Sequence, residues 1–433
     1  MDEFLSYQPH CLGGRATAVV SATGYSENDE NETQMVCKIY HPEVQRRHEG
    51  LTMEVTYRVA EEDRLKAEHD EVRGELEIPS MFNYLPKFYF YGDVEGTSTQ
   101  RVRSMVRRRW KGHRTMRIIG MKRLTKITTL KGWEFVKAWL EGVLCHAFLW
   151  QNFIEHGDPS LNNLMYDEET GCGVLTDFDL SLLQWEPRVF GTDRTGTIPF
   201  MALDLLKEQY WDGRRERYYH HELESFIWIL PYVFLQYQDG KRVKGVDVNA
   251  WITSNYTNCL KEKLFFYTHG AIEDAAKKVQ ANYKVCWKFA DALCTTLRAC
   301  HNRIQDRQAT QRQVIEIEES DDNGVENDEA IVLPDARIAR ASRIERVEEN
   351  EEQFEEDEKQ SDESFLEDSN DLWKGFNEKL VLHLKRRRSP HFVPLLNSFT
   401  HFKPSFVLTD EKKKELYEKY SDILGRTRPK ETS

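Results

Sequence analysis

Short apolar runs separated by polar stretches characterise the first part of the chain. Four of these runs are rich in β-branched and aromatic residues and predict strands, at Thr17–Ala22, Met35–Tyr40, Phe88–Tyr91 and Met116–Met121. The stretch Arg46–Val72 is rich in Glu, Arg and Ala and predicts one or two helices between the second and third strands. Residues 1–124 are therefore expected to form a small strand-rich region with a helical insertion.

From Leu130 onward the spacing of apolar residues becomes helical. One apolar helix face is marked by positions i, i+4, i+7, i+8 and i+11, at Val136, Leu140, Val143, Leu144 and Ala147. Further helices are predicted at Glu222–Tyr237, Leu260–Phe266 and Ala271–Cys300. A strand-rich region followed by a larger helical one, residues 125–302, predicts an α+β fold.

Charge is distributed unevenly along the 433 residues. The chain holds 60 basic and 73 acidic residues, a net charge of -13. The segment Glu316–Asp371 has 23 acidic and five basic residues, so its net charge is -18 and that of the remaining chain is +5. Such a segment has too few aromatic residues to fold alone, and residues 303–371 are predicted to be a disordered acidic insertion. A uniformly acidic or wholly disordered chain is excluded.

Helical patterns return after the acidic segment. Helices are predicted at Leu372–Leu384 and Asp410–Leu424, with Thr409 as the N-cap of the last one. Residues 372–433 are thus a C-terminal helical segment, and the helical lobe is the candidate surface for it to pack on.

Cysteine spacing and hydropathy indicate the compartment. The eight cysteines form neither a C-x-x-C pair nor a zinc-binding spacing with histidine, so they are interpreted as reduced thiols. The first ten residues lack the features of a secretory signal. The most apolar run, Phe226–Leu235, is far shorter than the roughly 20 residues of a membrane helix. A cytoplasmic or nuclear location without membrane contact is expected.

The strongest chemical signal is the stretch H-G-D-P-S-L-N-N at residues 156–163, followed by L-T-D-F-D at residues 175–179. ATP-dependent phosphoryl transfer needs one carboxylate to orient and deprotonate the attacking hydroxyl, and further oxygen ligands to hold Mg²⁺ against the phosphates. Asp158 is the predicted base, and Asn163 and Asp177 are the predicted metal ligands. Each residue alone also fits a turn or a strand end, and the joint spacing favours the catalytic interpretation.

Other parts of a nucleotide site occur in the expected order. Lys38 lies in an apolar strand, from which it would reach the α and β phosphates, although a surface lysine on an edge strand is the alternative. Gly13 and Gly14 precede the first strand and would let backbone N–H groups cover the phosphates, although they also fit an ordinary turn. A Glu from the following helix should pair with Lys38. Spacing favours Glu54, with Glu49 as the rival.

These motifs together resemble the protein kinase superfamily, and more narrowly the fungal-type protein kinase domain family. The resemblance covers roughly residues 11–300 and is carried by ordered short motifs: G-R-A-T at 14–17, R-I-I-G-M at 117–121, H-G-D-P-S-L-N-N, D-F-D, G-T-I-P-F-M-A at 196–202 and L-E-S-F at 223–226. The family implies a bilobal fold that binds Mg-ATP between a strand-rich N-lobe and a helical C-lobe. It also implies that Met121 to Arg123 meet the adenine, that Ser160 belongs to the catalytic loop, and that the acceptor is a Ser or Thr hydroxyl of a protein.

Three positions depart from the pattern of most protein kinases. Ser160 stands where most of them carry a Lys that helps neutralise the transferred phosphate, although the fungal-type family itself favours Ser. Gly157 replaces the Arg of H-R-D, which commonly contacts a phosphorylated activation loop, so control by loop phosphorylation is not expected. Glu222 replaces an Asp that props the catalytic loop, and the longer carboxylate is expected to fit less well and to lower activity.

Two other functions compete with a protein kinase. The H-G-D variant also occurs in small-molecule phosphotransferases of the aminoglycoside and choline kinase type, but the G-T-I-P-F-M-A run favours a peptide acceptor. A pseudokinase scaffold is the second alternative, because of Gly157 and Glu222. The simultaneous presence of Lys38, Asp158, Asn163 and Asp177 argues against it.

Three charged or apolar segments suggest partners outside the nucleotide site. Arg101–Arg114 holds seven basic residues and no acidic one, and would contact nucleic acid or the acidic segment if it is more than a solvated loop. Lys385–Pro390 resembles a nuclear localisation signal. The apolar residues Val314, Ile315 and Ile317, followed by acids, resemble a SUMO-interaction motif, in which a short strand adds to a partner's sheet.

Overall fold

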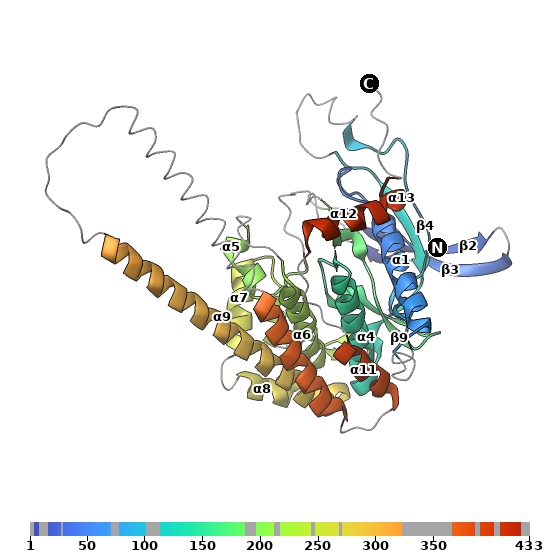
Figure 1. Ribbon diagram of the computed structural model, residues 1–433. Helices are drawn as coiled ribbons and strands as arrows, with labels where there is room; N and C mark the ends of the chain where they lie inside the picture. The colour runs from blue at the N-terminus through green and yellow to red at the C-terminus, as the bar shows by residue number, and fades with distance from the viewer. Residues whose placement is uncertain are drawn as a thin grey trace, which may run out of the picture.

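The computed structural model describes residues 4–7, 16–26, 29–70, 78–100, 113–186, 196–211, 217–243, 247–267, 271–322, 366–385, 390–401 and 408–425. These residues form a small strand-rich N-terminal lobe and a larger, mostly helical C-terminal lobe (Figure 1). The predicted α+β fold with two lobes is therefore confirmed.

The N-lobe is built on one antiparallel sheet of five strands in the order β1-β2-β3-β5-β4. The strands are β1 (Phe4–Tyr7), β2 (Ala18–Ser26), β3 (Asp29–Tyr40), β4 (Phe88–Asp93) and β5 (Arg117–Lys122). The four predicted strands are confirmed, and β1 is an addition that was not predicted. Because Lys38 pairs with Ile119 and Val36 with Met121, these four residues lie on one face of the sheet.

Helix α1 (Glu49–Glu68) packs against β4 of this sheet. It begins later than the predicted Arg46, because the side chain of His48 caps it by accepting a hydrogen bond from the Gly50 backbone N–H at 3.0 Å. Leu51, Val55 and Val59 face the core at helical spacing, and all are less than 5% exposed.

Two apolar helices form the centre of the C-lobe. These are α4 (Gly132–Gln151), whose predicted apolar face is buried, and α6 (Tyr219–Gln236), every residue of which is buried. A hydrogen bond from Trp139 Nε1 to the carbonyl of Phe226 joins the two helices at 3.0 Å. Other C-lobe helices in the described part of the chain include α5 (Glu208–Trp211), α7 (Tyr256–Phe266), α8 (Ala271–Lys278), α9 (Trp287–Asp322) and α11 (Val393–His401).

Short strands and 3₁₀ turns connect the larger elements of the structure. A three-stranded sheet is formed by β6 (Thr125–Lys126), β8 (Leu164–Asp167) and β9 (Cys172–Leu175), and β7 (Ile154–Glu155) pairs with β10 (Leu182–Leu183). The hairpin β11 (Tyr237–Gln238) and β12 (Lys241–Arg242) follows α6. The 3₁₀ turns are η1 (Met81–Tyr84), η2 (Ile127–Thr129), η3 (Leu161–Asn163), η4 (Phe178–Leu180), η5 (Asp204–Leu206), η6 (Asp247–Trp251), η7 (Ala281–Cys286) and η9 (Pro390–Phe392).

Helix α9 overlaps two features that were expected in the acidic segment. It continues to Asp322, so the boundary expected at residue 303 falls inside a helix. The backbone at Val314, Ile315 and Ile317 is helical rather than extended, so pairing with a partner's sheet would require this end of α9 to unwind. Most of the acidic segment, residues 323–365, lies outside the described residues.

The C-terminal segment packs on both lobes. A helix over residues 366–384 begins six residues before the predicted start and runs beside α9 and α6, and α11 lies against α4 (Figure 1). The last predicted helix is divided into α12 (Asp410–Lys419) and α13 (Ser421–Leu424), which cross over α1 in the N-lobe (Figure 1). Thr409 caps α12 as predicted, because its side chain accepts from the Lys412 N–H at 3.3 Å.

Several predicted features lie outside the described residues. Gly13 and Gly14 do, and so do residues 101–112 of the basic segment and residues 386–389 of the predicted localisation signal. Within the residues that are described, no helix combines the length and the apolar character that crossing a bilayer requires.

Candidate active site

Lys38 is the centre of an ion-pair network between the lobes. Strand β3 presents its ammonium to two carboxylates, Glu49 at 2.7 Å and Asp177 at 2.6 Å. The second oxygen of Glu49 accepts a hydrogen bond from the Phe178 backbone N–H at 3.0 Å. Glu49 therefore joins strand β3 to the D-F-D segment. Lys38 is only 4% exposed, and its two carboxylate partners hold the buried ammonium in place.

Glu54, the residue favoured to pair with Lys38, is not the partner. Its carboxylate instead accepts a hydrogen bond from the hydroxyl of Tyr91 on β4 at 2.8 Å. The error comes from the helix start, because α1 begins at Glu49 and its first turn already lies beside the sheet.

Burial and neighbouring charges set the protonation of this network. Burial lowers the pKa of Lys38, but the carboxylates of Asp177 and Glu49 outweigh it and raise the pKa well above the usual value, so the ammonium is retained. Burial, together with Asp177 and Asp179, raises the pKa of Glu49 to about 7 although Lys38 lowers it. The site thus carries more negative charge than its one lysine neutralises.

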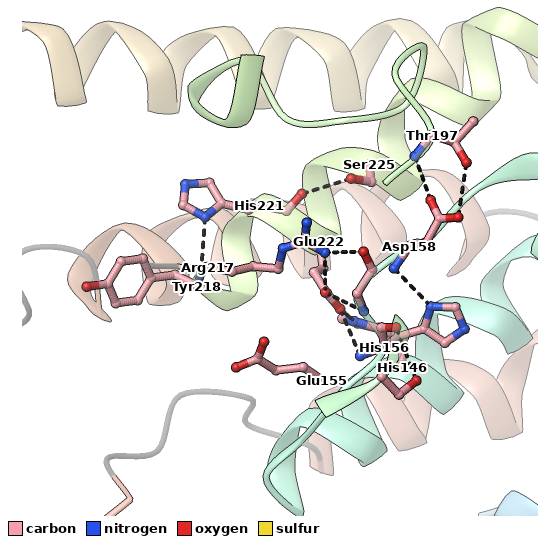
Figure 2. Close-up of polar contacts among 12 residues, drawn as sticks. His146, Glu155, His156, Asp158, Thr197, Arg217, Tyr218, His221, Glu222 and Ser225 are labelled. Atoms are coloured by element: carbon pink, nitrogen blue, oxygen red, sulfur yellow. Dashed lines mark hydrogen bonds and ion pairs between the residues drawn. The ribbon is translucent and has the colours of Figure 1, made fainter. Parts of the chain in front are cut away.

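Two segments of the chain contact Asp158, and Figure 2 shows the contact with Thr197. Asp158 Oδ1 accepts from the Thr197 backbone N–H at 2.7 Å and Asp158 Oδ2 from the Thr197 hydroxyl at 3.1 Å. Asn163 Nδ2 donates to the Asp158 carbonyl at 2.8 Å and lies 3.3 Å from Oδ2. The structure therefore brings Asp158 and Asn163 together with the G-T-I-P-F-M-A segment.

Asp177 and Asp158 interact through charge. Burial raises the pKa of Asp158, and the nearby Asp177 carboxylate raises it further, whereas the hydrogen bonds from Thr197 lower it. Asp177 itself has a left-handed backbone with φ of 66°, an uncommon conformation outside glycine that turns the chain into the 3₁₀ turn η4.

Glu222 fits its site, contrary to the expectation from its length. Its carboxylate accepts hydrogen bonds from the backbone N–H groups of Gly157 at 2.8 Å and His156 at 3.3 Å (Figure 2). The ring of His146 in α4 and the guanidinium of Arg217 contact the same carboxylate. Burial alone raises the pKa of Glu222, but His146, Arg217 and His156 lower it to about 2, so it stays ionised.

The backbone conformation at position 157 explains why glycine stands there in place of arginine. Its φ is +83°, and a Cβ at this position would lie 2.4 Å from the carbonyl oxygen of Leu180. No side chain fits there unless the backbone moves.

A buried guanidinium reaches the catalytic loop from another part of the chain. Arg217, 8% exposed and just before α6, donates a hydrogen bond to the Gly157 carbonyl and pairs with Glu222 at 3.3 Å. Burial lowers the pKa of Arg217, but Tyr210, Glu222 and Glu155 raise it above the usual value. No motif marks Arg217 along the chain, since it is one of three arginines in four consecutive residues, with Arg214 and Arg215.

The other predicted site residues take peripheral positions. Ser160 is 1% exposed and its carbonyl accepts from the Asn163 N–H at 3.1 Å, so it shapes the loop. Met121 lies opposite Val36 on the sheet face that carries Lys38, whereas Arg123 is exposed just beyond the strand. Between them, Lys122 pairs with Asp167 of the C-lobe at 2.8 Å and ties the lobes together.

The donor set suits a hard divalent cation such as Mg²⁺. Because the amide nitrogen of Asn163 bonds to Asp158, its carbonyl oxygen is the atom left to meet an ion. Asp177 is 39% exposed at its side chain, and its charge raises the pKa values of both Asp158 and Glu49. A cation on Asn163 and Asp177 would relieve this repulsion, so these residues fit the metal that the motif implies.

A second group of potential ligands lies away from this site. Asp204, His220 and His221 are buried and present their ligand atoms within 4.8 Å of one another. His221 Nδ1, however, accepts from the Tyr218 backbone N–H at 3.0 Å, and Asp204 pairs with Lys207 at 2.5 Å. These contacts engage His221 Nδ1 and one carboxylate oxygen of Asp204 in interactions within the protein.

Comparison with known proteins assigns the family. No curated protein matches the chain. Among solved structures, vaccinia related kinase 3 aligns with 12% sequence identity and a TM-score of 0.34, over 61% of this chain and 74% of that one. The family model described as fungal protein kinase matches residues 1–234, more than half of the sequence. The chain therefore belongs to the fungal protein kinase family.

Proposed function

We propose that this protein transfers the γ-phosphate of ATP to Ser or Thr hydroxyls of protein substrates, with Mg²⁺ as cofactor. Membership of a protein kinase family supports a kinase-type activity. The observation that carries the finer proposal is the double hydrogen bond from Thr197 to the Asp158 carboxylate. It brings the predicted base directly against the segment that would receive a peptide.

In this mechanism Asp158 orients the acceptor hydroxyl and takes its proton. Burial and Asp177 raise the pKa of Asp158, which makes it a better proton acceptor than an exposed aspartate. Thr197 fixes the carboxylate, so little reorganisation is required when the substrate arrives.

Lys38, held by Glu49, binds the phosphate oxygens of the nucleotide. Its raised pKa keeps the ammonium charged inside a buried site. Asn163 and Asp177 would hold Mg²⁺, which supplies charge neutralisation at the phosphates. Glu222 holds the backbone of the catalytic loop and thereby fixes the position of Asp158 relative to the lysine.

A comparison of protein and small-molecule acceptors tests this proposal. The full chain is incubated with Mg-ATP and either a mixture of Ser- and Thr-containing proteins or a mixture of choline and aminoglycosides, and the phosphorylated product is identified by mass spectrometry. We expect phosphoserine or phosphothreonine, and no product from the Asp158→Asn variant.

The alternatives give different results in the same experiment. Phosphate found only on small molecules would assign a small-molecule phosphotransferase. A thermal shift with Mg-ATP but no product from either mixture would assign a pseudokinase. Either result overturns the proposal.

A further inference from the structure

The C-terminal helices meet the N-lobe at a defined patch next to the candidate active site. Helices α12 and α13 cross α1, and Tyr420, between them, stacks on Trp185 with ring centroids 5.7 Å apart and an interplanar angle of 29°. Trp185 lies two residues after the end of β10 and eight residues beyond Asp177 in the sequence. The patch therefore joins three segments that are far apart in the chain.

Apolar burial makes this contact specific. Tyr420 and Ile423 are each 2% exposed, and Leu416 is 7% exposed, although they belong to a short helical segment with a strongly charged outer face. A segment that buries these three side chains on the folded body is an integral part of the fold.

Ion pairs fix the orientation of the same contact. Arg58 of α1 forms two parallel hydrogen bonds with Asp422 at 2.7 and 2.8 Å, and Lys419 pairs with Glu62 one turn further along α1. The Arg58 and Asp422 side chains are 38% and 53% exposed. An ion pair this exposed stabilises the contact little, but its geometry fixes how α13 lies against α1.

The segment just before the N-terminal end of α1 contacts the chain next to Trp185. Arg47 forms an ion pair with Glu186, the residue after Trp185. Glu49 follows two residues later and binds Lys38 and the Phe178 N–H. A helix moves largely as a rigid rod, so a shift of α1 at Arg58 would also move Glu49 away from Lys38.

We propose that α12 and α13 are a built-in positioning element, which holds α1 so that Glu49 keeps Lys38 in place for phosphoryl transfer. Tyr420, Ile423 and Asp422 are the positioning residues. The inference rests on the proposed kinase function for its kinetic consequence, and on the contacts above for its structural one.

Point variants of the full chain test this proposal. Tyr420→Ala removes the stacked ring, Asp422→Arg reverses the charge facing Arg58, and Arg58→Asp with Asp422→Arg restores the pair in the opposite sense. Asp410→Arg makes the same charge change on α12 at an exposed pair with Lys413, and is the matched control. Each variant is measured for kcat and for KM of ATP, and for hydrogen exchange of the α1 and α6 amides.

We expect Tyr420→Ala to lower kcat at least about 10-fold and to speed exchange in α1 but not in the buried helix α6. Asp422→Arg should lower kcat roughly 3- to 5-fold, the reversed pair should recover most of it, and Asp410→Arg should resemble the wild type. Unchanged α1 exchange in Tyr420→Ala would overturn the proposal, as would faster α1 exchange with unchanged kcat.

Phosphoryl transfer and hydrogen exchange test the proposed function and the positioning role separately. A wild-type chain without any phosphoryl transfer would contradict the proposed function alone, since α1 exchange still reports whether the C-terminal helices hold α1. Equal acceleration of exchange in α1 and α6 would show general destabilisation and would refute a positioning role.

Discussion

At the scale of single residues, the identity of the partner of Lys38 decides how the site is held. Glu49 contacts both Lys38 and the Phe178 N–H, whereas Glu54 contacts Tyr91 on the outer strand. We expect Glu49→Gln to lower kcat/KM for ATP by on the order of 10²-fold, because it removes the charge that orients the lysine. Glu54→Gln, the matched control on the same helix, should stay within about 3-fold of the wild type.

The raised pKa of Glu49 predicts opposite effects of acid on activity and stability. As pH falls through about 7, Glu49 becomes protonated and loses its charge against Lys38, so kcat/KM for ATP should fall. Its folded pKa lies above the ordinary value of 4.5, so its contribution to stability is present below pH 4.5 and is lost as pH rises through about 7.

The comparison of wild type with Glu49→Gln isolates this group. Activity and the free energy of unfolding are measured for both proteins between about pH 4.5 and 8, and the difference between them is plotted. A wild-type activity profile that Glu49→Gln reproduces in shape would contradict the assignment.

Gly157 shows that a missing motif residue can reflect backbone geometry. Its positive φ excludes a side chain, and so does the Leu180 carbonyl oxygen, 2.4 Å from where a Cβ would lie. We expect Gly157→Ala to destabilise the fold by about 2–4 kcal/mol in denaturant unfolding, from strain plus displacement of the loop. Gly171 also has a positive φ, but a Cβ there would meet only Tyr166 at 3.8 Å. The loss in Gly171→Ala should therefore be limited to about 1–2 kcal/mol.

At the scale of secondary-structure elements, the buried carboxylate of Glu222 connects α6 with α4 and the catalytic loop. It accepts from two backbone N–H groups of that loop and contacts His146 and Arg217. Glu222→Gln should destabilise the protein by about 3–5 kcal/mol in denaturant unfolding, because it leaves the buried guanidinium of Arg217 without its counter-charge.

Shortening the same side chain tests its length directly. Glu222→Asp, the residue that most protein kinases carry here, withdraws the carboxylate by about one C–C bond and should weaken the bonds to Gly157 and His156. Thermal unfolding temperature and kcat should both decline. Equal or higher activity in Glu222→Asp would support the opposite view, that glutamate fits this site poorly.

Periodicity predicted the elements better than the contacts between them. Strand and helix patterns located β2 to β5, α4, α6 and the last helices, because burial imposes a repeating pattern on neighbouring residues. The position of Asp158, Asn163 and Asp177 near one another followed from their motif. The choice between Glu49 and Glu54 depended on where one helix starts, and Arg217 reaches Gly157 through tertiary packing. Neither feature leaves a local pattern in the sequence.

At the scale of the whole molecule, the C-lobe core is completed by a helix that follows the acidic segment. Trp373, Phe376 and Leu380 of the helix over residues 366–384 are buried, and the Phe376 ring lies 6.0 Å from that of Trp139 in α4. Arg307 of α9 pairs with Glu367 at 2.9 Å. The acidic residues therefore interrupt one folded body between two adjacent helices.

Two leucines on this helix provide a matched test of that role. Leu380 is 0% exposed and Leu382 is 45% exposed. Leu380→Ala should lower the free energy of unfolding of the whole protein by about 2–5 kcal/mol, and Leu382→Ala by about 0.5 kcal/mol or less. Similar small effects of both substitutions in denaturant unfolding would show that the C-terminal helix is dispensable for the core.

We propose that the two lobes together assemble a working phosphotransfer site around Lys38 and Asp158. The most direct measurement is the rate of γ-phosphate transfer from Mg-ATP to protein by the full chain, compared with Asp158→Asn at equal nucleotide occupancy. We predict transfer by the wild type and a loss of at least about 10²-fold in the variant. Equal rates in the two proteins, or no transfer by either while nucleotide is bound, would contradict the account.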